Sequence, residues 1–502
     1  MDDTCGSRSQ LLPSDDIKIN LPKAYHRWIT VEPLVVLVFF SSSLSGTILT
    51  NLYLYQTCRV TLNFNYTVCA HLDSQGSDSE LHHIETLVQP HTTVLLLGKS
   101  LLESCVPAVL SFFLGPWSDL YGRRPLLMWS LLGYSVMYFS YLGATFIPSL
   151  PPSFLLFASL PLGLSGGSIS IFSGMYSYVT DVSTPEKRSL RIGIVDACLY
   201  GGMLAGASAS SFVFTAAGDM GYLTIFAISG VCCFLGFLYC AFLLPESINR
   251  TQAVHPSCCL GHDLFQWHYI IDVLKTSFKA RPNHGRVLIL LTILALASFI
   301  STFDGEGAVA FLFTRNKFGW TIKDYTLLLS TNLVISIFGM LLGTSIFSTW
   351  LQVPDAPLVM FGYFCKAVAA VLAALSPVSW YLYAELVLTA VLDCQGRRAI
   401  VIGVSGSLVG PLSRSLLTKI VPGDEIGKVF SLLASLEALT PLASSAVYTL
   451  LYTATLNIFP GAYLLLSAGI FSFDALMLLC VLIIQHIVVE RELGCSADNE
   501  IN

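Results

Sequence analysis

Long apolar segments separated by polar ones dominate the chain. The apolar segments cover residues 33–55, 92–114, 125–147, 153–178, 192–214, 221–244, 287–312, 325–348, 357–375, part of 380–418, 427–450 and 461–489. Most of them contain about the 20 residues that a helix needs to cross a bilayer. Helices are expected because a helix pairs its own backbone polar groups in lipid, whereas an open strand does not. The pattern predicts an all-α membrane protein with twelve transmembrane helices in two six-helix pseudo-repeats.

The longest polar stretch between apolar segments divides the twelve into two groups of six. The expected organisation is an N-terminal tail 1–32, a six-helix bundle 33–244, a central linker 245–286, a six-helix bundle 287–489 and a C-terminal tail 490–502. Apolar residues recur in the linker at three- and four-residue steps, at Leu264, Trp267, Ile271, Leu274 and Phe278. That spacing predicts an amphipathic helix on the membrane surface.

One interval does not fit a simple count of helices. Between Trp380 and Thr418, the polar residues 393–398 are too charged to lie unpaired in lipid. We expect the tenth helix to begin near Ala399 and to end near Lys419, which leaves 380–398 as an outer extension or a sequence insertion. A thirteenth span is the alternative, and it would place the C-terminus on the other side of the membrane.

Composition agrees with a membrane protein. Hydrophobic residues make up 54% of the 502 residues and charged residues only 12%, whereas soluble domains have about 25% charged residues. This excludes an ordinary cytosolic enzyme, a disordered scaffold and a nucleic-acid binder. The net charge of −6 is spread along the chain and indicates no polybasic anchor. The first 30 residues lack the apolar core of a cleavable signal peptide.

The distribution of basic residues predicts the orientation. Polar segments on the side of the two termini carry most of the Lys and Arg residues, and the opposite segments carry Arg59, Arg315, Lys317 and Lys323. The positive-inside rule then places both termini in the cytoplasm. The C-terminal tail shows no strong sorting signal, so both the plasma membrane and the lysosomal membrane remain open as locations.

The first outer loop, about 56–91, carries features of an exported segment. Asn65 begins an Asn-X-Thr sequon, which predicts glycosylation at this residue. Cys58 and Cys69 flank the sequon and could close a small disulfide; the alternatives are free thiols or pairing elsewhere.

No metal or cofactor is expected. The linker residues His255, Cys258, Cys259 and His262 lack the separated Cys pairs that are usual in zinc sites. A Gly-rich nucleotide-binding motif is also missing, which argues against a pump driven by ATP. The spans contain no His cluster or Ser/His/Asp arrangement, so an enzyme is disfavoured.

A glycine-rich motif follows the second apolar segment. Gly115, Asp119, Gly122, Arg123 and Arg124 give the spacing G-x-x-x-D-x-x-G-R-R. The two glycines permit a tight turn, and Asp119 can pair with Arg123 four residues later or cap a neighbouring helix end. In a chain with six plus six helices and a long centre, this motif resembles that of the major facilitator superfamily. The resemblance implies that Asp119, Gly122, Arg123 and Arg124 form a conformational gate.

Further segments are similar to solute carrier family 46. They are Val31-Glu32-Pro33-Leu34, Trp117-Ser118-Asp119, Asp181-Val182-Ser183 and Pro411-Leu412-Ser413-Arg414. The resemblance implies transport of organic anions such as folates, or of amphipathic conjugates such as muropeptides, cyclic dinucleotides and steroid derivatives. The folate-transporting member has a histidine in helix seven, where this chain has no histidine between Thr302 and Glu306. The loop at 350–357 keeps Asp355 without a basic residue, so the internal repeat is degenerate there.

Ionisable residues inside the predicted spans are the candidates for binding a solute or protons. A buried charge in a membrane is costly and needs a partner or a wet cavity. The candidates are Lys99, Glu103, Asp196, Asp304, Glu306, Arg414 and Glu437. Lys99 and Glu103 share a helix face and could instead be a structural ion pair. Gly305 and Gly307 predict a break in helix seven beside Asp304 and Glu306.

These observations predict a secondary transporter that works by alternating access, with proton coupling through the buried carboxylates. Its partners would be a small organic solute, protons and the lipid bilayer. The alternative is a membrane receptor or scaffold that keeps the fold without transport.

Overall fold

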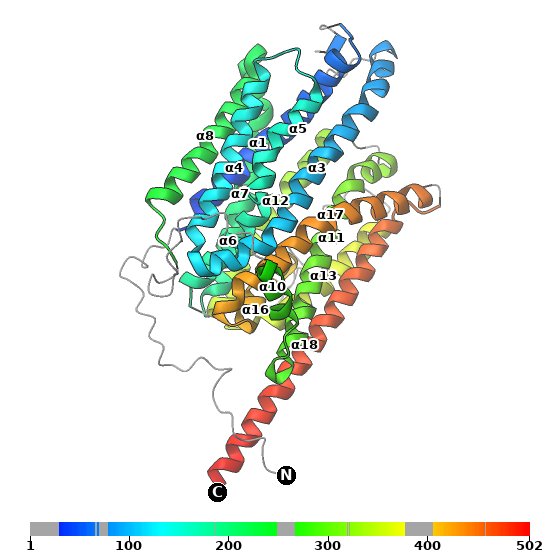
Figure 1. The fold of residues 1–502 in the computed structure, drawn as a ribbon. Helices are drawn as coiled ribbons and strands as arrows, with labels where there is room; N and C mark the ends of the chain where they lie inside the picture. The colour runs from blue at the N-terminus through cyan, green and yellow to red at the C-terminus, as the bar shows by residue number, and fades with distance from the viewer. Residues whose placement is uncertain are drawn as a thin grey trace.

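The computed structural model describes residues 30–65, 68–69, 79–184, 186–247, 267–318, 320, 322–376, 405–456 and 458–501. Long helices run between the two ends of a bundle (Figure 1). The first half contains α1 (Glu32–Gln56), η2 (Thr57–Thr61), α3 (Ser79–Tyr121), α4 (Arg123–Thr145), η3 (Pro152–Phe154), α5 (Leu155–Leu164), α6 (Gly167–Val182), α7 (Arg188–Ala217), η4 (Gly218–Met220) and α8 (Gly221–Phe242).

The second half follows a short helix of the linker. That linker helix is α10 (Trp267–Phe278), followed by the turn η5 (Pro282–His284). The second half contains α11 (Gly285–Phe318), α12 (Ile322–Gly343), η6 (Thr344–Trp350), α13 (Asp355–Leu375), α16 (Ser405–Ile420), η7 (Gly423–Glu425), α17 (Ile426–Thr455) and α18 (Ala462–Ile501).

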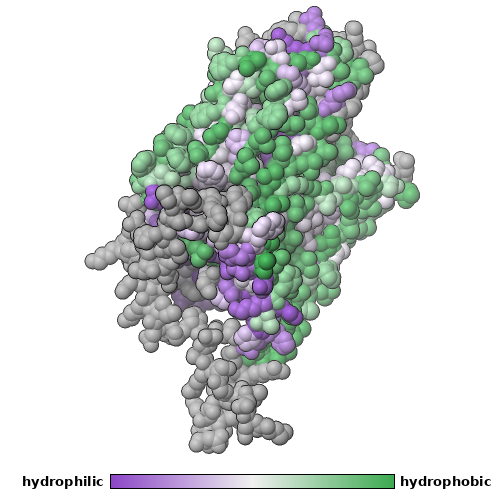
Figure 2. All heavy atoms as spheres, viewed as in Figure 1, coloured by the Kyte–Doolittle hydropathy of each residue, from purple (hydrophilic) through white to green (hydrophobic). Residues whose placement is uncertain are grey.

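The helices have the length and surface of a membrane protein. Within the described residues, 11 helices are long and apolar enough to cross a bilayer. The space-filling view shows apolar side chains over the middle of the visible face and hydrophilic ones gathered towards its two ends (Figure 2). The prediction of an all-α membrane protein is confirmed. The description of α16 begins at Ser405, so the start of the predicted tenth helix lies outside the described residues.

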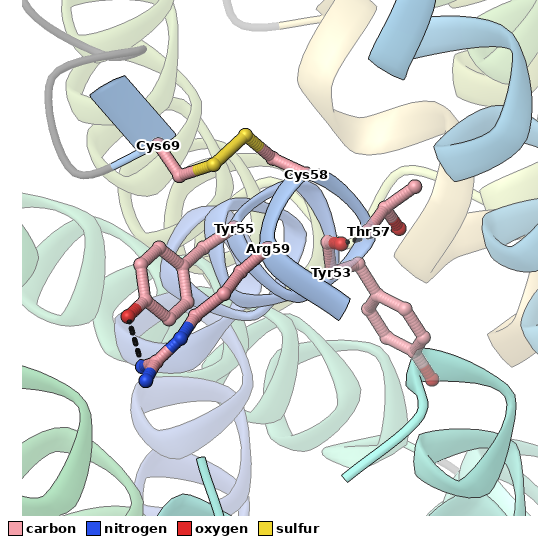
Figure 3. Close-up of a disulfide and its surroundings, with 6 residues drawn as sticks. All are labelled: Tyr53, Tyr55, Thr57, Cys58, Arg59 and Cys69. Atoms are coloured by element: carbon pink, nitrogen blue, oxygen red, sulfur yellow. Dashed lines mark hydrogen bonds between the residues drawn. A yellow bond between two sulfur atoms is a disulfide. The ribbon is translucent and has the colours of Figure 1, made fainter. Parts of the chain in front are cut away.

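We name the two ends of the bundle by what lies there. The linker end holds the end of α8, helix α10 and the start of α11. The opposite, disulfide end holds the bond between Cys58 and Cys69 (Figure 3). Beside that bond, Arg59 donates a hydrogen bond of 2.8 Å to the hydroxyl of Tyr55. Asn65 lies exposed in the same loop.

Each half has its own internal packing, and two seams join the halves. In the first half α1 packs against α7, and α4 packs against α8. In the second half α13 packs between α16 and α18, and α11 packs against α17. The seams between the halves are formed by α3 with α17 and by α7 with α12. Within the first half, a small residue allows α1 and α7 to pack closely: a Cβ on Gly206 of α7 would collide with the carbonyl oxygen of Phe40 in α1.

Two local expectations about glycine are wrong. Gly115 lies inside α3, and the turn before α4 is made at Gly122 alone, whose φ of 115° favours glycine. Helix α11 continues unbroken through Gly305 and Gly307. Gly305 instead makes room for the ring of Tyr448, with which a Cβ would collide. Close packing against an aromatic ring therefore explains this glycine better than a break does.

The fourth predicted helix is interrupted. The expected segment 153–178 is split into α5 and α6, with Gly166 at a φ of 82° between them. Pro161 lies in the last turn of α5, where it removes a backbone donor and disfavours continuation of the helix.

Several sequence predictions fall outside the described residues. They concern the polar interval 380–398, with its alternative of a thirteenth span, and the linker residues 255–262. Within the linker, the described helix α10 covers all but the first of the predicted amphipathic positions.

Candidate functional site

Three buried side chains and one partly buried side chain, from four helices, meet between the two halves. Tyr176 of α6 and Asp196 of α7 come from the first half, and Arg414 of α16 and Glu437 of α17 come from the second. The Tyr176 hydroxyl donates a 2.5 Å hydrogen bond to Asp196 Oδ1. Arg414 Nη2 lies 3.1 Å from Glu437 Oε1, and its Nη1 lies 3.8 Å from Asp196 Oδ2. We call these four residues the central cluster.

The central cluster has more negative than positive charge when all its groups are ionised. One guanidinium, that of Arg414, faces the two carboxylates of Asp196 and Glu437. Asp196 is only 3% exposed and Arg414 only 7%. Burial makes such charges costly unless they are paired, and it strengthens the attraction between them. The guanidinium also lies 4.6 Å from the centre of the Tyr176 ring, a cation–π distance.

The local sequence places each member of the central cluster. Asp196 lies a little more than two turns into α7, beyond its basic first turn at the linker end. Glu437 lies four residues before Pro441, inside α17. Because proline has no N–H, the backbone carbonyl of Glu437 lacks its usual helical partner. The carboxylate and this carbonyl therefore form a polar spot in an otherwise apolar helix.

The structure separates Asp304 from Glu306. The two are two residues apart on the continuous helix α11, so they point to different sides of it. Asp304 is close enough to act electrostatically on Tyr200 and Glu437, which places it beside the central cluster. Glu306 instead interacts with Ser467 of α18 and with the charge of Lys366 of α13. Asp304 therefore faces the boundary between the halves, and Glu306 faces the interior of the second half.

Lys99 and Glu103 form an ion pair on α3. Nζ of Lys99 lies 2.7 Å from Oε2 of Glu103. The other oxygen of Glu103 is buried without a hydrogen-bond partner. Its charge acts on a group of tyrosines in the core of the first half, Tyr53, Tyr134, Tyr138 and Tyr141. This pair therefore belongs to the interior of the first half.

The predicted gate residues form a second charged site at the linker end. Arg123, only 2% exposed, lies 2.5 Å from Asp119 and 3.2 Å from Asp181 of α6. Its Nη1 also donates a 2.8 Å hydrogen bond to Ser118. Two carboxylates and a hydroxyl thus hold one buried guanidinium. This network fixes the start of α4 to the ends of α3 and α6.

Gly122 and Arg124 complete this gate network within the first half. A Cβ on Gly122 would collide with the carboxylate of Glu246, which accepts a 2.8 Å hydrogen bond from the backbone N–H of Arg123. Arg124 Nε donates a 3.0 Å hydrogen bond to the carbonyl of Cys240, near the end of α8. A helix end leaves carbonyls unpaired, and a basic side chain can satisfy them.

The gate network touches the second half through α17. A Cβ on Gly427, the second residue of α17, would collide with both Asp119 and Arg123. The Asp119 carboxylate therefore lies at the N-terminal end of a helix, where negative charge is favoured. About two turns further along the same seam, Ser111 of α3 hydrogen-bonds with Ser435 of α17.

Helix α7 also meets the second half through a polar network around Asp355, the first residue of α13. Asp355 Oδ2 lies 2.7 Å from Lys419 Nζ and 2.8 Å from the hydroxyl of Ser415, both in α16. Ser189 of α7, in the first half, donates a 3.0 Å hydrogen bond to Oδ1. The loop at 350–357 lacks a basic residue, but α16 supplies one. The loop itself thus lacks the basic residue of the motif, as the sequence indicates, and Asp355 takes its basic partner from another helix.

Some residues of these sites were missed in the sequence. Tyr176, Ser189 and Lys366 were not among the candidates, although Lys366 is a charged residue within a predicted span. That charge was the available signal. Tyr176 and Ser189 carry no comparable signal, because tyrosine and serine are common in such helices. No group of three His, Cys, Asp or Glu residues is placed to hold a metal ion in the part of the chain that the structure describes.

Comparisons with known proteins agree with this architecture. The profile of the Major Facilitator Superfamily matches residues 34–445. The probable peptidoglycan muropeptide transporter SLC46 of Drosophila melanogaster is 30% identical over 468 residues, covering 89% of this chain and 84% of that protein. The lysosomal proton-coupled steroid conjugate and bile acid symporter SLC46A3 of Gallus gallus is 25% identical, covering 88% and 91%. The proton-coupled folate transporter of Bos taurus is 26% identical, covering 89% and 91%.

Solved structures show the same fold. The human organic anion transporter MFSD10 superposes with a TM-score of 0.63 at 16% identity, covering 89% of this chain and 98% of that one. The proton:xylose symporter XylE gives a TM-score of 0.59 at 14% identity, covering 89% and 93%. These relatives and neighbours are transporters and not enzymes, as the sequence predicts. The chain therefore belongs to the Major Facilitator Superfamily and, within it, to solute carrier family 46, and it is a secondary transporter.

Proposed function

We propose that this transporter moves an organic anion or an amphipathic conjugate together with protons, and that the central cluster binds both. The observation that carries the proposal is the single guanidinium of Arg414 held between Asp196 and Glu437, which come from opposite halves. Relatives are named for muropeptides, for steroid conjugates and bile acids, and for folate, and two of these names include proton coupling. Folate-like solutes, muropeptides and cyclic dinucleotides are thus the classes to test.

The charge balance of the cluster suggests how a proton and an anion are linked. With both carboxylates ionised, the single positive charge of Arg414 faces two negative charges, and a further anion is repelled. A proton on Asp196 or Glu437 removes one negative charge from beside the guanidinium, and a proton on Glu437 also weakens its contact with Nη2. A guanidinium binds carboxylate and phosphate oxygens well because its donors are arranged as a fork. Proton binding would therefore raise the affinity for an anionic solute, and the solute would raise the affinity for the proton.

The remaining candidates take different places in this proposal. Asp304 is a further proton- or solute-binding residue, because it lies beside the central cluster. Glu306 and the pair Lys99 and Glu103 lie inside the two halves and remain candidates for proton binding there. Asp119, Gly122, Arg123 and Arg124 act as the gate, which must open at the linker end when the two halves rock about the site.

For the membrane and the orientation, we propose a plasma or lysosomal membrane with both termini in the cytoplasm. The basic residues at the linker end support this orientation. The disulfide between Cys58 and Cys69 supports an oxidising compartment at the other end. Asn65 is exposed in the same loop, and we propose that it is glycosylated.

The test is uptake of labelled folate, a muropeptide and a cyclic dinucleotide by cells that express the wild type, with surface expression measured separately. The variants are Arg414→Lys and, as a matched control at the disulfide end, Arg59→Lys. We expect the wild type and Arg59→Lys to take up at least one of these solutes. We expect Arg414→Lys to lose that uptake. If Arg414→Lys takes up every accepted solute as well as the wild type does, the proposed role of the cluster is contradicted.

A further inference from the structure

The linker helix α10 has apolar side chains on two different sides. Tyr269, Val273, Thr276 and Ser277 are buried. They lie on the side that packs against α3, α17 and α11. Four large apolar residues are exposed, namely Trp267 (77%), Ile271 (49%), Leu274 (41%) and Phe278 (54%). Their spacing of three and four residues places them in one stripe along the helix.

Basic residues lie along one edge of the exposed stripe. Lys275 lies one turn after Ile271 on the same side of the helix, and Lys279 follows directly after Phe278, the last residue of α10. Both lysines are exposed. The surface of α10 therefore combines an apolar stripe with a row of cations, which is the arrangement of a helix that lies in a membrane interface.

The two ends of α10 are attached to different halves of the transporter. At its start, the ring of Trp267 contacts Phe113 of α3 edge to face, with 6.3 Å between the ring centres. Just beyond its end, Arg281 lies 2.6 Å from Glu425, and Lys279 lies 3.3 Å from the same carboxylate. Glu425 belongs to η7, directly before α17. Helix α10 thus lies across the seam between α3 and α17 at the linker end (Figure 1).

We propose that the exposed surface of α10 binds anionic phospholipid, and that this binding stabilises the closed seam between α3 and α17. The apolar stripe would enter the boundary between headgroups and acyl chains, with the two lysines at the headgroups. A membrane surface is the fitting partner because α10 packs directly against two membrane-spanning helices, α3 and α17. Anionic lipids are concentrated in the cytoplasmic leaflet, where the proposed orientation places the linker end.

The lipid contact is tested with the full chain reconstituted in vesicles of phosphatidylcholine, alone or mixed with phosphatidylserine. Either lipid carries brominated acyl chains, which quench nearby tryptophan fluorescence. The signal of Trp267 is obtained as the difference between the wild type and Trp267→Phe. We expect stronger quenching by brominated phosphatidylserine than by brominated phosphatidylcholine. A lysine near an anionic surface contributes about fivefold to affinity, and Glu425 already offsets the charge of Lys279, so Lys275→Gln with Lys279→Gln should reduce the preference about fivefold or more.

The control for the lipid experiment is Lys317→Gln at the disulfide end. It makes the same kind of charge change away from α10 and should leave the preference intact. Equal quenching by the two lipids would overturn the anionic-lipid proposal. No quenching by either would place the stripe outside the bilayer and favour a protein partner instead.

The effect on the seam has its own measurement, which does not depend on the solute carried. Hydrogen exchange of the backbone amides in 108–121 and 427–438 is compared in the two kinds of vesicle. We expect slower exchange with phosphatidylserine in the wild type, and no difference in the double lysine variant. Exchange that is equal in both lipids for the wild type would show that the lipid does not stabilise the closed seam.

Discussion

Arg414 connects the two halves through charge. Its guanidinium faces Glu437 in its own half and Asp196 in the other half, and its Nε is buried without a partner. A buried cation between two carboxylates can exchange one of them for an anionic group of a solute. The same arrangement makes the residue important for stability, because removing it leaves two negative charges buried.

Substitutions of Arg414 should separate these two roles. Arg414→Ala should lower the free energy of unfolding by about 3–5 kcal/mol, since removing one partner leaves uncompensated buried charge. Arg414→Lys keeps the charge but lacks the planar fork, so it should fold and bind solute weakly. Thermal unfolding in detergent and uptake in vesicles measure the two effects. Wild-type uptake by Arg414→Lys would contradict solute binding by the guanidinium.

Gly427 is the residue at which the gate meets the second half. A methyl group there would collide with Asp119 and Arg123 at the N-terminal end of α17. Gly427→Ala should therefore weaken the closed seam and speed hydrogen exchange in the first turns of α17. Gly423→Ala is the matched control, because a Cβ at Gly423 meets open space. Equal exchange in the two variants would argue against direct contact between the gate and α17.

Helices α3 and α17 come close because small residues face each other along their seam. Ser111 and Ser435 share a hydrogen bond, and a Cβ on Gly115 would collide with Ser431. Alternating access requires these helices to separate at the linker end. Movement of the two halves therefore depends on separation of α3 from α17.

A covalent bridge across this seam should stop transport. Cysteines at both Ser111 and Ser435 should form a disulfide under mild oxidation, and uptake should fall and then recover with a reductant. The single variants Ser111→Cys and Ser435→Cys, oxidised in the same way, control for the native cysteines. Full uptake by the oxidised, demonstrably bridged protein would contradict rocking of the halves about this seam.

The ion pairs of Arg281 and Lys279, which follow α10, with Glu425 should weaken only in strong acid. Burial acts against ionisation of Glu425, but hydrogen bonds and charges from Arg281 and Lys279 outweigh it and hold its pKa below the ordinary value of 4.5. A carboxyl whose pKa is lower in the folded state contributes stability above its unfolded pKa and loses it as the pH falls through the folded pKa. Hydrogen exchange of the α10 backbone amides should therefore become faster only when the pH falls below the ordinary pKa of a glutamate. Glu425→Gln should show the faster exchange already at neutral pH.

The sequence was informative about elements and less so about their details. Length and hydropathy identified the membrane helices, because the bilayer imposes both. The α5–α6 interruption was missed, since Pro161 and Gly166 also occur within continuous membrane helices. The predicted break at Gly305 was wrong because a glycine can equally serve a close contact, here with Tyr448. Which role a glycine has depends on a neighbour that is distant in sequence.

At the scale of the whole molecule, the described contacts between the halves include two polar networks at the linker end and the central cluster. The gate network reaches α17 at Gly427, and the Asp355 network reaches α7 at Ser189. Both would have to open for the central cluster to become accessible from that end. Protonation of the cluster would then be coupled to the opening and closing of these networks.

The sequence showed which charged residues to consider, but not how they combine. Asp196, Arg414 and Glu437 were recognised because charge inside a membrane span is costly. Their meeting depends on how the two halves pack, and nothing local in the sequence encodes that. For the same reason, Asp355 looked as if it lacked a basic partner until Lys419 was found beside it.

The most direct test of proton coupling at the central cluster is the pH dependence of uptake in Asp196→Asn. The purified chain is reconstituted in vesicles, and uptake of an accepted solute is measured at acidic and neutral outer pH, with and without a proton gradient. The exposed carboxylate variant Glu186→Gln is the control. We expect uptake by the wild type and the control to rise at acidic pH and uptake by Asp196→Asn to be independent of pH. The same pH dependence as in the wild type, in Asp196→Asn and also in Glu437→Gln, would contradict the proposal that a carboxylate of the central cluster carries the coupled proton.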